Sequence, residues 1–207
     1  MLYLVKTPWF IKKLYPTCTW EVKTNAKELY LTFDDGPQPG VTEFVLETLK
    51  VHDAKATFFC IGKNVRENRS LYSQILDEGH QVGNHTFHHL NGWNTNDDKY
   101  LRDIEEASSV IDSHLFRPPY GRITRFQLQQ IQRAGFQLRP IMWTVLSGDF
   151  DKNITEKQCY LNVIRNSHPG SIIVFHDNIK SFPRLKGTLP GILSYFKEKG
   201  YCFKSLL

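Results

Sequence analysis

Short apolar runs alternate with longer amphipathic segments along most of this chain. The apolar runs are rich in β-branched and aromatic residues, which predicts strands over residues 29–33, 56–61, 80–84, 115–117, 136–143, 170–176 and 201–203. Between them, apolar residues recur at helical spacing, which predicts helices over residues 41–51, 64–78, 97–111, 124–134, 155–166 and 189–199. Strands that alternate with helices in this way indicate βαβ units and a parallel sheet.

Chemically unusual residues follow most of the predicted strands at their carboxyl ends. Parallel α/β folds place their functional sites there. With about seven strands, the fold class that fits best is α/β, as an incomplete or distorted (β/α) barrel of parallel strands. No repeat, low-complexity tract or linker divides the 207 residues, so we expect one domain over residues 28–207, with a lead-in, residues 1–27, packed on it.

The start of the chain is apolar but lacks the pattern of an export or membrane signal. Lys6 and Pro8 interrupt the run, no cationic segment precedes it, and it is too short for a transmembrane segment. Four widely spaced cysteines form no C-x-x-C pair, and Cys60 and Cys202 lie in strand-like runs, so we expect reduced core thiols. These features favour a cytoplasmic location over the cell envelope.

The charge of the chain excludes little. A net charge of +5 and a pI near 9.0 favour an anionic partner to a small degree. No dense Lys/Arg cluster is present, so we expect no nucleic-acid partner. By itself, the charge suits a cell-wall polymer or a membrane surface equally well.

Two adjacent carboxylates end the first apolar strand, in residues 32–37, Thr-Phe-Asp-Asp-Gly-Pro. Gly36 and Pro37 force a turn, so the carboxylates lie at the mouth of the strand and not within it. Like charges this close raise each other's pKa and need compensation. A metal ion is the obvious partner, which makes Asp34 and Asp35 candidate ligands.

Histidines supply further candidate ligands in residues 85–89, His-Thr-Phe-His-His. His85 and His89 are four residues apart, so in a helical turn both imidazoles share one face, whereas His88 points elsewhere. Two imidazoles and one carboxylate are a common set for a divalent metal, with positions left for water and substrate. A helix start that is rich in histidine by chance is the alternative, and the carboxylate pair argues against it.

Two other predicted strands also end in reactive residues. Arg117 precedes the rigid turn of residues 118–121, Pro-Pro-Tyr-Gly, which could hold a nearby backbone N–H ready to stabilise an oxyanion. His176 ends the apolar strand 170–176 and is the residue type that transfers protons near neutral pH. We therefore expect Arg117 and His176 to belong to the same site as the carboxylates.

Together these residues resemble the ordered motifs of the polysaccharide deacetylases of the NodB-homology type, carbohydrate esterase family 4. The resemblance runs from about Glu28 to the C-terminus, and the motifs occur in the family's order. They are Thr32-Phe33-Asp34-Asp35-Gly36-Pro37, His85-Thr86-Phe87-His88-His89, Arg117-Pro118-Pro119-Tyr120-Gly121, Trp143 to Phe150, and Val174-Phe175-His176.

The resemblance implies a metal-dependent hydrolase that removes N-acetyl groups from an amino-sugar polymer or oligosaccharide. The partner would be an N-acetylated carbohydrate, either peptidoglycan or a chitin-like chain. By resemblance, Asp35, His85 and His89 would bind one divalent metal ion, most often zinc. Such an ion can lower the pKa of a water ligand from about 15.7 towards ~7.

The resemblance also implies the catalytic roles. Asp34 would be the base that takes a proton from the attacking water, and Arg117 would hold Asp34 in place. The metal and the backbone N–H of Tyr120 would stabilise the oxyanion. His176 would protonate the leaving amine, with Asp149 keeping it charged and oriented.

The chain departs from the family pattern in the wall of the site. The fourth motif usually reads D-x-x-D-W, and here Asp149 keeps the second Asp, while Leu146 replaces the first and Phe150 replaces the Trp. In the fifth motif, Val174 replaces a Leu. We expect these changes to alter the substrate wall more than the chemistry, because every acid, base and ligand is present.

Two other functions fit the same residues. The fold could hydrolyse a small amide, such as a formylated amino sugar or a ureide. It could also be a catalytically idle carbohydrate-binding domain, although a binding domain needs neither a base at Asp34 nor an acid at His176.

Overall fold

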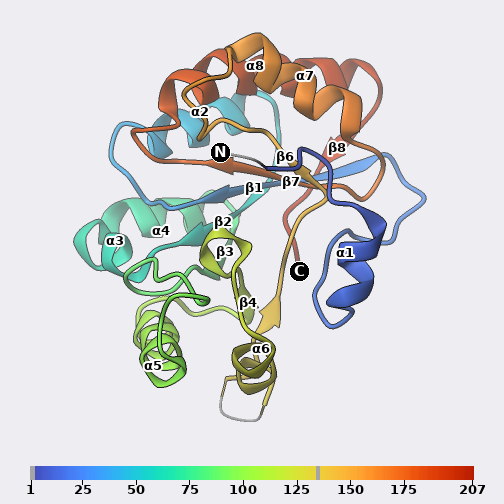
Figure 1. The fold of residues 1–207 in the computed structure, drawn as a ribbon. Helices are drawn as coiled ribbons and strands as arrows, with labels where there is room; N and C mark the ends of the chain where they lie inside the picture. Colours follow the sequence, from blue (N-terminus) through green and yellow to red (C-terminus); the bar gives the residue numbers. More distant parts are fainter. Residues whose placement is uncertain (1–2, 134–135) are drawn as a thin grey trace.

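The centre of the fold is a curled parallel sheet, in a computed structural model that describes residues 3–133 and 136–207. The strands are β1 (Glu28–Asp34), β2 (Ala56–Cys60), β3 (Gln81–Asn84), β4 (Leu115–Phe116), β5 (Arg139–Pro140), β6 (Val145–Leu146), β7 (Ile172–His176) and β8 (Cys202–Phe203). Their order is β5–β4–β3–β2–β1–β7–β6, with β8 beside the start of β1 (Figure 1). Within the described residues β5 and β6 form no ladder with each other, so the expected incomplete (β/α) barrel is confirmed.

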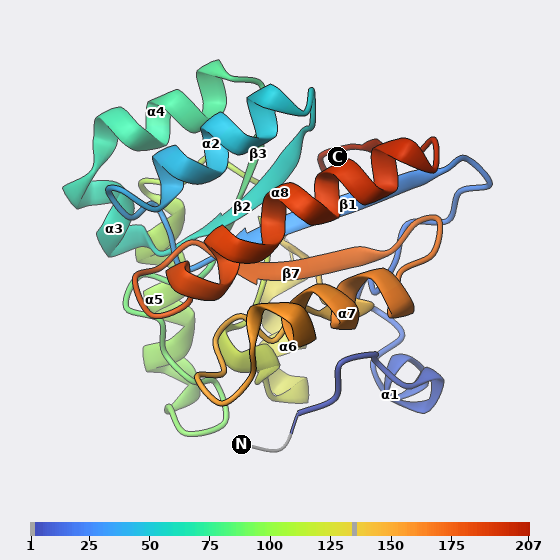
Figure 2. The ribbon, with the colours of Figure 1, turned by 90° about the horizontal axis from the view of Figure 1, so that it is seen from above.

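Helices cover the outer side of the sheet. In Figures 1 and 2, α2 (Thr42–Val51), α7 (Glu156–Asn166) and α8 (Phe182–Glu198) lie together along β1 and β7. Apolar side chains on these helices are buried against the strands and form the main core. The other helical segments are α1 (Trp9–Leu14), α3 (Gly62–Glu67), α4 (Arg69–Asp77), α5 (Asp97–Ser108), the 3-10 turn η1 (Pro119–Gly121) and α6 (Arg125–Ile131).

The central strand, β1, is the best-packed element around the site. Every residue of β1 after Glu28 is buried. The ring of Phe33 stacks on Phe58 of β2 and Phe175 of β7, with centroids 5.1 and 6.0 Å apart. Because dense packing on both sides holds β1, the residue at its carboxyl end, Asp34, has a well-defined position.

Two predicted helices have different bounds in the structure. The helix expected over residues 64–78 is two helices, α3 and α4, because Asn68 leaves helical geometry at φ −130°, ψ 51°. The side-chain amide of Asn68 donates to the carbonyl of Asn64 (3.0 Å), so the side chain competes with the helix backbone. The helix expected over residues 189–199 begins earlier, at Phe182, and contains Pro190, which removes one helical N–H donor.

The strand predicted over residues 136–143 is wrong in its length, since only β5 (Arg139–Pro140) forms within that range and β6 follows after it. Pro140 has no N–H to continue a ladder, and the N–H of Met142 donates to Thr19 in the lead-in (2.8 Å). Ala134, the last residue of the helix predicted over residues 124–134, lies outside the described residues, as does Gly135.

The prediction that both Cys60 and Cys202 lie in the core is wrong for Cys202. Cys60 is buried, but Cys202 is exposed. Successive side chains on a strand point to opposite faces, so in β8 it is Phe203 that reaches the core.

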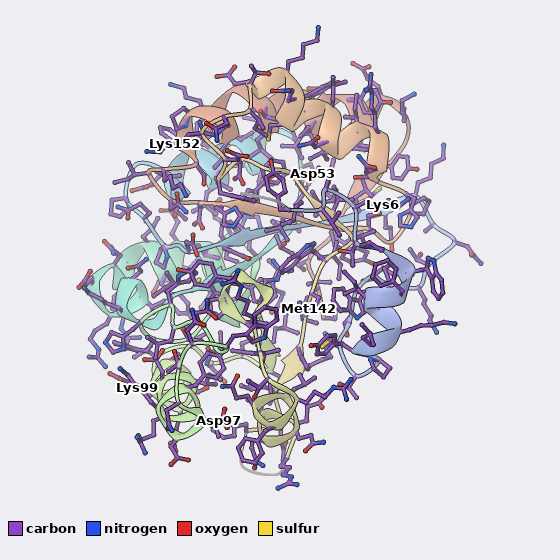
Figure 3. The ribbon with its side chains drawn as sticks, in the orientation of Figure 1. Lys6, Asp53, Asp97, Lys99, Met142 and Lys152 are labelled. Carbon is purple, nitrogen blue, oxygen red and sulfur yellow. The ribbon has the colours of Figure 1, made fainter. Side chains whose placement is uncertain are left out.

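The lead-in lies along the free edge of β6. Lys6, labelled in Figure 3, forms an antiparallel bridge with Val145, and Thr19 forms a parallel bridge with Ile141. These pairs cover backbone groups that an open sheet edge would leave unpaired. Within the described residues, none of the helices combines the length and apolar character that a membrane crossing requires.

Candidate active site

The register of the sheet brings the reactive strand ends together at one edge. Asp34 of β1 is paired with His176 of β7, and Asn84 of β3 is paired with Phe116 of β4. The residues that follow these positions therefore face a common space. A pocket of about 330 Å³ lies there, lined by the side chains of Asp34, Asp35, His85, His89, Tyr120, His176 and their neighbours.

Arg117 is a fully buried cation whose guanidinium donates four hydrogen bonds. Its Nη1 donates to Oδ1 of Asp34 and to Oγ1 of Thr32, both at 2.7 Å. Its Nε and Nη2 donate to the carbonyls of Ile141 (3.1 Å) and Met142 (3.0 Å). These bonds tie the carboxyl end of β1 to the strand connection on the far side of the open barrel, so Asp34 is both oriented and charge-compensated.

Burial lowers the pKa of Arg117, and the Asp34 carboxylate works against that shift. The guanidinium also lies 4.0 Å from the ring centroid of Phe59. Replacing only one partner of such a pair leaves a buried charge without compensation.

We expect Arg117→Leu to lower the free energy of unfolding by about 3–5 kcal/mol, because it leaves the Asp34 carboxylate buried and unpaired. Urea denaturation gives the value. Arg125→Leu, at the exposed start of α6, is the matched control and should change stability by less than ~0.5 kcal/mol. The double variant Asp34→Leu/Arg117→Leu should be less destabilised than Arg117→Leu, and equal losses in Arg117→Leu and Arg125→Leu would contradict this account.

Asp35, His85 and His89 lie close together, although not in the predicted way. Oδ1 of Asp35 is 3.1 Å from Nε2 of His89 and 3.6 Å from Nε2 of His85. The helical turn expected over residues 85–89 is wrong, because Thr86 and His89 adopt positive φ values of 62° and 58°. The two imidazoles meet through a left-handed bend and not through i, i+4 helical spacing.

Asp103, which belongs to none of the motifs, stabilises the bend of residues 85–89. Oδ2 of Asp103, on α5, accepts hydrogen bonds from the backbone N–H groups of Phe87 and His88, both at 2.9 Å. Oδ1 of Asp103 lies 2.6 Å from Nδ1 of His88, which turns that imidazole away from His85 and His89. His88 is therefore outside the group, as the sequence indicates.

The protonation of the group suits a cation. Nδ1 of His85 donates to the carbonyl of Arg117 (2.7 Å), which leaves the lone pair on Nε2, the atom facing Asp35. Burial lowers the pKa of His85 to about 4, so this ring is neutral at pH 7. Burial by itself would raise the pKa of Asp35, but the approach of His89 and the charge of His176 hold it well below its usual range.

The residues present fit a divalent metal. Oδ1 of Asp35 is buried and, among the described residues, takes no hydrogen bond of ordinary geometry. One ligand atom from each of Asp35, His85 and His89 lies within 4.8 Å of the other two. Ligands at ~2.0–2.1 Å from a tetrahedral zinc are about 3.3 Å apart, which matches the spacing of Oδ1 from the two imidazoles.

His176 and Asp149 form a second buried pair across the pocket. Nδ1 of His176 lies 2.8 Å from Oδ1 of Asp149, and the backbone N–H of His176 donates to Oδ2 (2.7 Å). Ser147 also donates to Oδ1 of Asp149 (3.0 Å), which fixes the carboxylate. Burial alone would lower the pKa of His176, but Asp149, with smaller effects from Asp35 and Asp34, raises it to about 9. The imidazole is therefore protonated at neutral pH.

This pair makes stability depend on pH. His176 binds a proton more tightly in the folded protein, with a pKa of about 9, than in the unfolded chain, with a pKa near ~6.5. Its contribution is present below pH ~6.5 and is lost as pH rises through about 9, which amounts to about 3 kcal/mol. Urea denaturation of the metal-free protein across this range should show the decline. His176→Gln should decline less steeply, since the part that remains comes from groups common to both proteins, such as the buried carboxyl of Asp177, whose pKa burial raises to about 8. If the free energy of unfolding fell equally with pH in both proteins, the pairing of His176 with Asp149 would be contradicted.

Tyr120 lies at the mouth of the pocket in a strained backbone position. Its φ of 60° follows Pro118 and Pro119, and its ring packs edge-on against His89, with centroids 4.6 Å apart. No acceptor among the described residues takes the backbone N–H of Tyr120. Six of the eight predicted site residues thus line one pocket, and the other two, Arg117 and Asp149, lie buried behind it, bonded to Asp34 and His176.

Several other polar and aromatic groups of the pocket were not predicted, among them Asn178 and Tyr3. Asn178 donates from Nδ2 to Oδ2 of Asp35 (2.7 Å), and its place two residues beyond His176 at a strand end is a signal that could have indicated it. Tyr3 comes from the lead-in, where nothing in the sequence links it to the site. Leu146, Phe150 and Val174 line the pocket, as their motif positions suggest.

Comparison with known proteins identifies the family. The sequence model described as polysaccharide deacetylase matches residues 21–138. A peptidoglycan-N-acetylglucosamine deacetylase of Bacillus cereus is 36% identical over 200 residues, covering 93% of each chain. This chain belongs to the polysaccharide deacetylase family. The resemblance drawn from the motifs is thereby confirmed, and with it the deacetylase class of enzyme.

Solved structures of the polysaccharide deacetylase family share this fold. A peptidoglycan N-acetylglucosamine deacetylase in complex with 4-naphthalen-1-yl-N-oxidanyl-benzamide matches with a TM-score of 0.87 and 31% identity, over 97% of this chain and 95% of that one. A protein of Bacillus anthracis described as a pseudoenzyme of carbohydrate esterase family 4 also matches, with a TM-score of 0.77 and 28% identity, over 90% of this chain and 66% of that one.

Proposed function

We propose that this polysaccharide deacetylase is metal-dependent and removes the acetyl group from N-acetylglucosamine units of peptidoglycan. The observation that carries the proposal is the meeting of three groups at one pocket: the Asp34–Arg117 pair, the His176–Asp149 pair and a group of metal-ligand type. The peptidoglycan substrate is supported by what the similar proteins are described as acting on.

Asp35, His85 and His89 would hold one divalent cation, for which zinc suits the two imidazoles and one carboxylate. When bound, such an ion supplies Lewis-acid polarisation of the acyl carbonyl and lowers the pKa of a water ligand. Asn178 donates a hydrogen bond to Oδ2 of Asp35, which leaves Oδ1 turned towards the imidazoles.

The remaining residues would move protons and stabilise charge. Arg117 donates to Oδ1 of Asp34, which leaves Oδ2 to accept a proton from the attacking water. The backbone N–H of Tyr120 would donate to the oxyanion as water adds to the carbonyl. Protonated His176, oriented by Asp149, would give its proton to the departing nitrogen, so acetate and a free amino sugar leave.

The test is a panel of substrates assayed for released acid, with and without added zinc. We expect acetate from peptidoglycan fragments that contain N-acetylglucosamine, and activity that falls on chelation and returns with metal. Faster release of formate from a formylated amino sugar would favour the small-amide alternative. Tight binding of the fragments without release of any acid would favour the idle binding domain.

A further inference from the structure

The lead-in reaches the wall of the catalytic pocket because it pairs with β6. The N–H of Leu146 donates to the carbonyl of Val5 (2.8 Å), and the N–H of Thr7 donates to the carbonyl of Thr144 (2.9 Å). The hydroxyl of Thr7 donates to the carbonyl of Trp143 (2.8 Å). The chain therefore runs antiparallel to β6, and the residues before Val5 lie beside the loop that carries Asp149.

Tyr3 enters the pocket at the end of this segment. Its ring packs edge-on against Phe150 (centroids 4.9 Å apart), and Phe150 in turn packs edge-on against His176 (5.3 Å). Gly148, at φ 85°, makes the approach possible, since a Cβ there would lie 2.8 Å from the phenolic oxygen of Tyr3. Burial and the nearby carboxylate of Asp151 raise the pKa of Tyr3, so its O–H stays neutral.

We propose that Tyr3 forms a subsite for the sugar unit next to the one that is deacetylated. This rests on the proposed function, in which His176 protonates the nitrogen of the reacting unit. Phe150 occupies the place beside His176, so Tyr3, one ring further along the same wall, faces the neighbouring sugar. A half-buried aromatic ring offers an apolar face on which a sugar ring can pack, while the O–H of Tyr3, against Gly148 and close to Asp151, holds the ring in place.

The subsite predicts an effect that depends on substrate length. With a tetramer of β-1,4-linked N-acetylglucosamine, Tyr3→Ala should raise KM by ~2- to ~12-fold and leave kcat nearly unchanged, since the ring touches no reacting atom. With single N-acetylglucosamine the two enzymes should not differ. Tyr3→Phe should keep most of the affinity. Trp9→Ala removes an aromatic ring from the same segment, 68% exposed on α1 and outside the pocket, and is the matched control.

Binding measured without turnover separates the subsite from the proposed function. Calorimetric titration of the tetramer into Asp34→Asn protein, alone and combined with Tyr3→Ala or Trp9→Ala, should show weaker binding only with Tyr3→Ala. Tyr3→Leu, which keeps apolar contact with Phe150, and a melting curve for each variant exclude loss of fold as the cause. Equal affinity in all variants, or no binding by the Asp34→Asn protein, would overturn the subsite. Binding that depends on Tyr3 beside a parent protein that releases no acetate would overturn the proposed function alone.

Discussion

Asp34→Asn is expected to lower kcat for acetate release by about 10²–10⁴-fold, the range lost when a general base is removed. Asparagine has the same shape, and its amide oxygen can still accept the hydrogen bond from Arg117, so the fold and the pocket should persist. It cannot take a proton from water. Acetate release at saturating substrate measures the effect.

Two controls make this result specific. Metal content should be unchanged in Asp34→Asn, because Asp35 and the imidazoles form the proposed ligand group and Asp34 does not. The melting temperature should fall, because buried Arg117 loses its carboxylate partner, so kcat is compared at a temperature where both proteins are folded. Asp53→Asn removes a carboxylate on the surface beside α2, away from the pocket, and should leave kcat unaltered. If Asp34→Asn released acetate as fast as the parent protein, the assignment of Asp34 as the base would be wrong.

His85→Ala is expected to abolish both bound metal and activity. His85 is one of only two imidazoles in the ligand group that the described residues form around Asp35, and its Nε2 carries the free lone pair. Loss of a partner that only orients a ligand already weakens metal binding by ~10–100-fold, so loss of the ligand itself should exceed that. Elemental analysis after dialysis gives the metal content, and acetate release gives the activity.

His88→Ala is the matched control for this variant. It removes a histidine from the same bend, yet the ring of His88 is turned towards Asp103 and away from Asp35. Asp103 would still hold the backbone N–H groups of Phe87 and residue 88, so the bend should persist. A His85→Ala protein that keeps one metal per chain, or a His88→Ala protein that loses it, would contradict the proposed ligand set.

The candidate site residues could be grouped from the sequence because their signals are local. Gly36 and Pro37 force a turn directly after a buried strand, which places Asp34 and Asp35 at its mouth whatever the rest of the chain does. Arg117 and His176 likewise end apolar strands. In a parallel sheet such ends meet at one edge, so a count of strands and their last residues was enough to group these side chains.

The shape of the group around Asp35 was not accessible in the same way. Spacing of four residues predicts a helical turn for His85 and His89, but the segment instead bends through positive φ values at Thr86 and His89. The cause is a tertiary contact, the acceptance of two backbone N–H groups by Asp103 on α5. No local pattern reveals that contact, because the hydrogen-bond partners lie on different elements.

Consecutive residues were enough to predict the fold class, the carboxyl ends of β1 and β7 and the reactive side chains, since periodicity, turn residues and motif order lie in neighbouring positions. The orientation of those side chains, and the residues that enclose them, depend instead on contacts between distant segments. Arg117 is satisfied by carbonyls of Ile141 and Met142, and the pocket wall is completed by Tyr3 from the lead-in. These contacts join segments that are far apart in the chain. They depend on how the strands and the lead-in pack around the pocket and not on any local propensity.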